Sequence, residues 1–239
     1  MNDEFYVGYA PQAPRNLGRW IIRISAALVI AGLAVGGMLV LEQPPFATSN
    51  FEYGVYRDYT GVLEDWPYPI LRTRDGSFLL VAPGKHGLNA GSISGQQVRL
   101  EGSLISRAEG RMLEVKPESL QVIGPGEDAP AQSDLGTVTL RGEIVDTKCY
   151  LGVMNPGNGK VHRDCAARCI SGGAPPAFVV TDAGGDPRVL LLTGSNGRRL
   201  NREVLDYVAE PLEIHGRLVR SGANLVLKAE PEQFRRNPE

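Results

Sequence analysis

The stretches Val98-Arg-Leu-Glu-Gly-Ser-Leu-Ile105 and Leu212-Glu-Ile-His-Gly-Arg-Leu-Val219 carry the same pattern of apolar residues around one glycine. Continuing without a gap, Leu113-Glu-Val-Lys-Pro-Glu-Ser-Leu120 lies over Leu227-Lys-Ala-Glu-Pro-Glu-Gln-Phe234. Agreement of the glycines, the Pro-Glu pairs and the apolar positions indicates an internal repeat, in which one structural unit is written twice.

The second copy of this unit is longer than the first. Its start, Gly142-Glu-Ile-Val-Asp146, lies over Gly61-Val-Leu-Glu-Asp65, and most of the additional length is segment 148–176. That segment holds all three cysteines of the chain. The sequence therefore predicts a common scaffold, with a Cys/His insertion in the second copy only.

Each copy is written as short stretches in which apolar and polar residues alternate, a pattern typical of half-buried β-strands. Plentiful glycine and proline (29 and 17 residues) suit short strands joined by turns. Five strands with a helix between the third and the fourth is the order of an OB-type barrel, and a small sandwich is the alternative. In the second copy we expect strands at 137–146, 177–181, 188–192, 212–219 and 225–229, and the helix at 201–208.

The predicted fold class is mainly β, with an N-terminal transmembrane helix followed by two tandem OB-like small barrels. The linker-like composition of Gly124-Pro-Gly-Glu-Asp-Ala-Pro-Ala-Gln-Ser133 separates the copies. The predicted parts are a tail at 1–19, the helix at 20–41, a first domain at 52–123, a linker at 124–135, and a second domain at 136–235 with its insertion at 148–176.

The N-terminal region predicts a membrane anchor. Residues from Ile24 to Leu41 are free of charge, and about 20 such residues cross the hydrocarbon of a bilayer. Three arginines precede the span, whereas the next basic residue after it is Arg57. The positive-inside rule then places residues 1–19 in the cytoplasm and the barrels in the periplasm of a bacterial cell, with a single pass through the inner membrane. A cleaved signal peptide is the alternative.

Within the anchor, Gly32 and Gly36 form a GxxxG pair. Small residues at this spacing let two membrane helices approach closely. The expected partners are therefore the membrane itself and a membrane-protein complex or a second helix.

The strongest chemical signal is a cluster of cysteine and histidine. Residues 161–170 are expected to be helical, which puts His162, Cys165 and Cys169 on one face, opposite Cys149. Three thiolates and one imidazole make a complete tetrahedral shell for Zn2+. Nearby Met154 adds a thioether, so copper(I) is an alternative, as is an iron-sulfur centre. The predicted metal ligands are Cys149, His162, Cys165 and Cys169, and zinc is the expected ion.

Other interpretations of the cysteines stay open at this point. Outside the cytoplasm thiols oxidise, so Cys149 could bridge to Cys165 or Cys169 as a structural staple. Alternatively, His162 could activate Cys149 for thiol-disulfide chemistry, or the cysteines could simply fill a core.

Enzyme signatures are otherwise missing from the sequence, which contains no Gly-rich phosphate loop, GxSxG elbow or HExxH motif. A net charge of −2 gives no field for nucleic acid. The carboxylates Glu143, Asp146 and Asp164 are expected to be solvated, and His86 to be a surface residue. The first domain is expected to be a spacer or a docking surface.

Cys149-Tyr-Leu-Gly, followed by His162-x-x-Cys165-Ala-x-x-Cys169 and Gly-Gly-x-Pro, resembles a pattern of uncharacterised bacterial membrane-anchored extracytoplasmic OB-like domains. The resemblance covers the second half of the chain and implies no activity. The architecture alone is similar to the haem chaperone of cytochrome c maturation. That family attaches haem through a histidine followed four residues later by tyrosine. No histidine of this chain is so followed, and haem is therefore not implied.

The sequence thus favours a membrane-anchored periplasmic metal-binding accessory or subunit protein, which carries a metal, transfers electrons or assembles a complex. Whether it is an enzyme stays undecided, with a non-enzymatic role favoured. A thiol-disulfide redox protein and a disulfide-stapled structural subunit are the alternatives.

Overall fold

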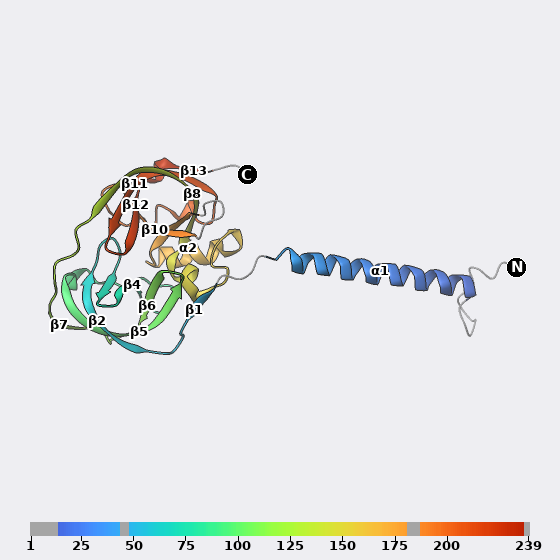
Figure 1. Ribbon diagram of the computed structural model, residues 1–239, viewed down its shortest axis with the longest axis horizontal. Helices are drawn as coiled ribbons and strands as arrows, with labels where there is room; N and C mark the ends of the chain where they lie inside the picture. The colour runs from blue at the N-terminus through green and yellow to red at the C-terminus, as the bar shows by residue number, and fades with distance from the viewer. Residues whose placement is uncertain (1–13, 44–47, 181–186, 237–239) are drawn as a thin grey trace. The chain divides into compact units, whose positions relative to one another are not determined.

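The computed structural model describes residues 14–43, 48–180 and 187–236 (Figure 1). Most of the predicted cytoplasmic tail, residues 1–13, lies outside the described residues, as does Thr181 at the end of an expected strand. The chain divides into two compact units, Met1–Pro45 and Phe46–Glu239. Both barrels belong to the second unit.

The first unit contains one long helix, α1 (Arg15–Leu41, 27 residues). None of its residues is buried, so its isoleucine, leucine and valine side chains are exposed along its length. Such a surface is stable in hydrocarbon and unfavourable in water. The helix is long and apolar enough to cross a membrane, a property that it shares with N-terminal signal sequences.

The first barrel is closed by five strands. They pair in the ring β2–β3–β4–β6–β5–β2, in which only the β4–β6 pair is parallel. Short strands β1 and β7 extend the sheet by pairing with β5. The strands are β1 (Ser49–Phe51), β2 (Arg57–Glu64), β3 (Ile70–Thr73), β4 (Gly76–Val81), β5 (Gln96–Arg107), β6 (Gly110–Val115) and β7 (Gln121–Pro125). A short 3-10 turn, η2 (Gly91–Ile93), precedes β5.

The second barrel closes in the same way, through the ring β8–β9–β10–β12–β11–β8 with a parallel β10–β12 pair. Strand β13 extends it by pairing with β11. The strands are β8 (Ser133–Asp146), β9 (Pro176–Val180), β10 (Arg188–Thr193), β11 (Leu212–Ser221), β12 (Asn224–Lys228) and β13 (Phe234–Arg236). The fold class predicted from the sequence, two OB-like barrels after an apolar helix, is therefore confirmed.

Strand registers in the two barrels correspond at the positions that the sequence alignment matches. Leu104 pairs with Leu113 in the first barrel, and Leu218 pairs with Leu227 in the second. Likewise, Gly61 lies opposite Val98, and Gly142 lies opposite Leu212. Matched positions of the two barrels thus have matched strand partners.

Glycine is required at the matched positions Gly61 and Gly142, because the backbone of the neighbouring strand comes very close to each of them. A Cβ atom at Gly61 would overlap the carbonyl oxygen of Arg72 on β3, and one at Gly142 would overlap that of Val179 on β9. In each barrel the glycine thus lies where its strand comes very close to the backbone of the paired strand, β3 or β9. A side chain here would force the two strands apart.

The prediction of a helix at 201–208 is wrong. The structure has turns there and one short 3-10 segment, η5 (Leu205–Tyr207). The chain leaves any helical path because Val208 bridges to Ile144, and the Ala209 N–H donates to the Ile144 carbonyl at 3.0 Å. Buried Val204 and Val208 have the spacing of a helix, but they pack onto the barrel core from turns.

The boundaries around the linker also differ from those expected. Strand β7 continues through Pro125, and β8 begins at Ser133, because β5 and β11 supply partners for these residues. At the other end, β1 precedes the predicted start of the first domain. The connection between the barrels is therefore shorter than the composition suggested.

The two barrels share a hydrophobic core. One cluster combines Tyr68, Ile105 and Met112 of the first barrel with Val179 and Leu191 of the second. The Tyr68 hydroxyl donates to the carbonyl of Leu192 at 2.8 Å across the same boundary. Since these contacts are buried, the barrels form one compact body.

Replacing Gly142 with alanine should destabilise the protein by about 1–3 kcal/mol, because the new Cβ overlaps the β9 backbone. Gly61→Ala should do the same in the first barrel. Thermal unfolding of the full chain in detergent, followed by near-ultraviolet circular dichroism, measures the effect. Gly124→Ala is the control, since nothing lies within 4 Å of a Cβ there. Equal stability of all four proteins would refute the close-approach argument.

Candidate metal centre

The insertion begins where β8 ends and has two parts. The first is a π-helical turn, η3 (Cys149–Val153), whose residues Tyr150 and Leu151 are buried in the shared core. The second is η4 (Lys160–His162) followed by helix α2 (Arg163–Ser171). The Asn201 side chain donates to the carbonyls of Ile170 and Ala174 and so satisfies the carboxyl end of α2.

The three cysteines meet between η3 and α2. Their sulfur atoms all lie within 4.8 Å of one another, and those of Cys149 and Cys169 are 3.9 Å apart. Cys149 and Cys169 are buried beside Ala174, Cys165 is half-buried, and all three are free thiols. The predicted convergence of every cysteine on one point is therefore found in the structure.

His162 lies in a second donor group that overlaps the first. Its Nε2 atom is 3.1 Å from Oδ2 of Asp146, and Asp146, Cys149 and His162 have ligand atoms within 4.8 Å of one another. The four ligands predicted from the sequence thus divide between two groups that share Cys149.

Asp146 was expected to be solvated, and this expectation is wrong. The residue is fully buried, and its Oδ1 atom accepts a hydrogen bond from the Cys149 N–H at 2.8 Å. Asp146 directly precedes helical residues 147 and 148, and an aspartate at this position commonly accepts the N–H three residues on as an N-cap, so the sequence contained a usable signal.

The other charged residues near the cluster have partners of their own. Glu143 accepts from Asn158 and from the Gly159 N–H, and Arg163 pairs with Glu210 at 2.6 Å. Asp164 is exposed as expected. Met154, the thioether considered for a copper(I) site, is exposed too.

A residue of the first barrel completes the site. Lys85, in the loop after β4, places its Nζ atom 2.9 Å from the sulfur of Cys165 and 3.5 Å from that of Cys169. Sequence reasoning missed it, because nothing in the local pattern links residue 85 to a helix 80 residues away. The first barrel is therefore part of the site, while neighbouring His86 is exposed as expected.

The loop that carries Lys85 is held on both sides. The Gly87 N–H donates to the Gly172 carbonyl at 2.9 Å, and a Cβ at Gly172 would overlap the carbonyl of Lys85. The buried Lys148 ammonium donates to the carbonyls of Ala82 and Gly84, and it pairs with Glu114 of β6 at 2.5 Å. The loop is thus fixed against the insertion by backbone contacts and one buried ion pair.

Charge within the site favours a thiolate at Cys169. The hydrogen bond from the Cys149 thiol, together with the Lys85 ammonium, lowers the pKa of Cys169 to about 7. The same hydrogen bond and burial raise the pKa of Cys149, so its proton is retained. Contact with Cys165 in turn raises the pKa of Lys85 and keeps the ammonium charged. A substantial fraction of Cys169 is therefore thiolate near neutral pH, the form that binds a soft cation.

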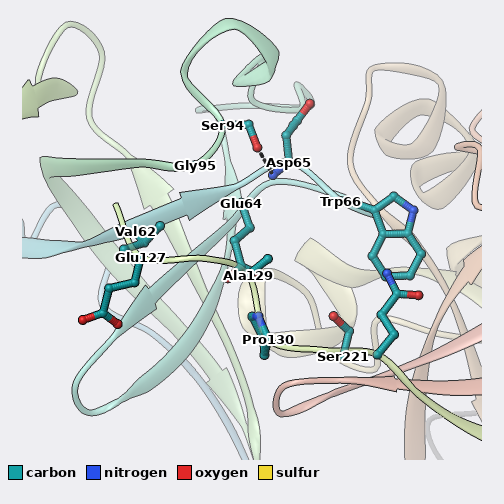
Figure 2. Close-up of a pocket in the computed structure, with 11 residues that line it drawn as sticks. Val62, Glu64, Asp65, Trp66, Ser94, Gly95, Glu127, Ala129, Pro130 and Ser221 are labelled. Atoms are coloured by element: carbon teal, nitrogen blue, oxygen red, sulfur yellow. Dashed lines mark hydrogen bonds between the residues drawn. The ribbon is translucent and has the colours of Figure 1, made fainter. Parts of the chain in front are cut away.

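A separate pocket of about 140 Å³ lies between β2, the connection after β7 and Ser221 (Figure 2). Its carboxylates are already paired: Glu64 with Arg72 at 2.8 Å and Asp65 with Arg199 at 2.6 Å. Figure 2 also shows the hydrogen bond that the backbone N–H of Asp65 donates to the Ser94 hydroxyl. The polar groups of this pocket thus stabilise the fold, and the cysteine cluster is the better candidate for chemistry.

Comparisons with known protein families, curated proteins and solved structures find no match to this chain. The chemical argument therefore rests on the geometry of the cluster itself.

Replacing Lys85 with methionine should raise the pKa of Cys169 above its value of about 7, because the thiolate loses an adjacent positive charge. In reduced, metal-free protein, the first thiolate should then form at higher pH than in the wild type. Ultraviolet thiolate absorbance during a pH titration measures this. Lys160→Met, which removes an exposed lysine of the same insertion, should leave the titration unchanged. An unchanged midpoint in Lys85→Met would show that the ammonium does not stabilise the thiolate.

Proposed function

We propose that this protein is a membrane-anchored metal-binding accessory protein or subunit, which carries a metal, transfers electrons or helps to assemble a membrane complex. The observation that carries the proposal is the meeting of all three cysteine sulfurs within 4.8 Å. Three cysteines at this separation, two of them buried, beside a histidine and a carboxylate form a donor set typical of transition metals.

Zinc is the proposed ion. Thiolate, imidazole and carboxylate are its usual protein ligands, and Cys149, Cys165, Cys169 and His162 supply the first two kinds. Copper(I) is the alternative, because it also prefers thiolates. An iron-sulfur centre is less favoured, since the usual clusters take four cysteines and this chain has three.

We also propose that α1 is retained as a single inner-membrane span with the barrels in the periplasm. The apolar surface of the helix and the three arginines at its start support this orientation. A Cβ at Gly32 or Gly36 would meet no other atom within 4 Å, so this face of the helix is open to a partner helix. The proposed partners are thus the membrane and a membrane-protein complex.

Metal analysis tests the metal proposal. Full-length protein purified anaerobically in detergent should contain bound metal, and Cys149→Ser should lose it, because Cys149 belongs to both donor groups. Metal per chain is measured by plasma mass spectrometry. His215→Ala, which removes an exposed histidine bonded to Thr139, is the control and should keep the metal. Less than about a tenth of an equivalent in the wild type would refute the proposal.

A thiol-disulfide redox role is the second candidate. It is favoured by the 3.9 Å separation of the Cys149 and Cys169 sulfurs and by the lowered pKa of Cys169. A thiolate at Cys169 could attack a disulfide of another molecule, and Cys149 could then resolve the mixed disulfide.

Intact mass after alkylation separates this candidate from the metal proposal. A redox protein should lose two hydrogens reversibly on oxidation and keep one alkylatable thiol, with peptide mapping placing the bond at Cys149 and Cys169. Cys165→Ser should still lose two hydrogens on oxidation but keep no alkylatable thiol, whereas Cys169→Ser should not form this bond. A bond that forms but exchanges with no added thiol or disulfide would instead indicate a structural staple, whose removal costs about 2–5 kcal/mol of stability.

A further inference from the structure

The donor group formed by Asp146, Cys149 and His162 is as closely built as the group of three cysteines. All three residues are buried, and their ligand atoms lie within 4.8 Å of one another. They come from three different elements: the end of β8, the start of η3 and the end of η4. The end of β8 and the two parts of the insertion that follows it thus fold back on one another to bring these side chains together.

Asp146 lacks a permanent cationic partner. Its contacts are the Cys149 N–H on Oδ1 and the His162 ring on Oδ2. Within the described ranges, no lysine or arginine pairs with it. The two nearby lysines are already engaged: Lys148 with Glu114 and two backbone carbonyls, and Lys85 with the sulfurs of Cys165 and Cys169.

A fully buried carboxylate is costly unless a positive charge offsets it. A divalent metal ion bound between Asp146, Cys149 and His162 would supply that charge. Oδ1 is held by the backbone, which leaves Oδ2, the oxygen that faces His162, as the available ligand atom.

We propose that the site holds two metal ions, with the Cys149 thiolate shared between them. One ion is bound by Cys149, Cys165 and Cys169, and the second by Cys149, Asp146 and His162. The inference rests on the proposed metal-binding function and adds a second position to it. A thiolate sulfur has enough lone pairs to bind two metals. Binding releases the thiol protons to solvent and changes no oxidation state.

The competing arrangement has one metal ion. Histidine ligands commonly donate their second ring N–H to a carboxylate, and Asp146 could orient His162 in this way. The two arrangements differ in stoichiometry, because only the first provides two positions.

Zinc counting distinguishes them. Full-length protein is reduced, stripped with a chelator and titrated anaerobically with Zn2+ in detergent, and native mass spectrometry counts the ions per chain. We expect two ions on the wild type, one on His162→Ala and one on Asp146→Asn. Exposed Asp164 and His215 provide the matched controls, and Asp164→Asn and His215→Ala should each keep two.

Cadmium gives a second readout, because its thiolate bonds absorb in the ultraviolet. The first equivalent should produce the same thiolate-to-metal band in the wild type and in His162→Ala, since that variant keeps all three cysteines. A first-equivalent band that weakens in His162→Ala would assign the histidine to the cysteine-bound ion and overturn the proposal.

Saturation of the wild type at one zinc ion would also overturn the second position while leaving the proposed metal-binding function intact. No bound zinc at all would overturn both. Near-ultraviolet circular dichroism checks the folding of each variant. If Asp146→Asn does not fold, the count on the wild type and on His162→Gln decides the question, and two ions on His162→Gln would reject the assignment.

Discussion

The close approach of the Gly172-Gly173 backbone to the loop at Lys85–Gly87 is the contact on which the cysteine site depends. It requires glycine at Gly87 and Gly172, because a Cβ atom at either would overlap carbonyl groups of the opposite segment. Through this contact the first barrel delivers Lys85 to the sulfurs of Cys165 and Cys169. The buried Lys148–Glu114 pair holds the same loop from the other side.

The matched topology of the two barrels explains how the insertion is tolerated. In the first barrel, β2 and β3 are joined by a short connection, whereas the equivalent strands β8 and β9 are joined by the whole Cys/His segment. Connections between strands accept added residues when the barrel registers are unaffected. The added segment then finds its own burial, because Tyr150 and Leu151 enter the core that the two barrels share.

The electrostatics of the site follow from its place between the barrels. Burial alone would keep thiols protonated, but the Lys85 ammonium and the Cys149 thiol together stabilise a thiolate at Cys169. The Asp146 carboxyl group is buried beside Cys149, whose N–H donates to its Oδ1 atom. A site with this balance of charge is suited to a cation, which connects the metal proposal to the fold.

The sequence by itself determined the apolar helix, the two barrels and the convergence of three cysteines, because each depends on a local period or on matched spacing. It did not determine the turns at 201–208, where pairing of Val208 with Ile144 overrides a helical pattern. Only the tertiary structure buried Asp146, placed His162 beside it and brought Lys85 to the thiols. The Lys85 contact joins two barrels 80 residues apart in the chain, and the Asp146–His162 contact depends on how the insertion folds back on β8, so neither follows from a local pattern of residues.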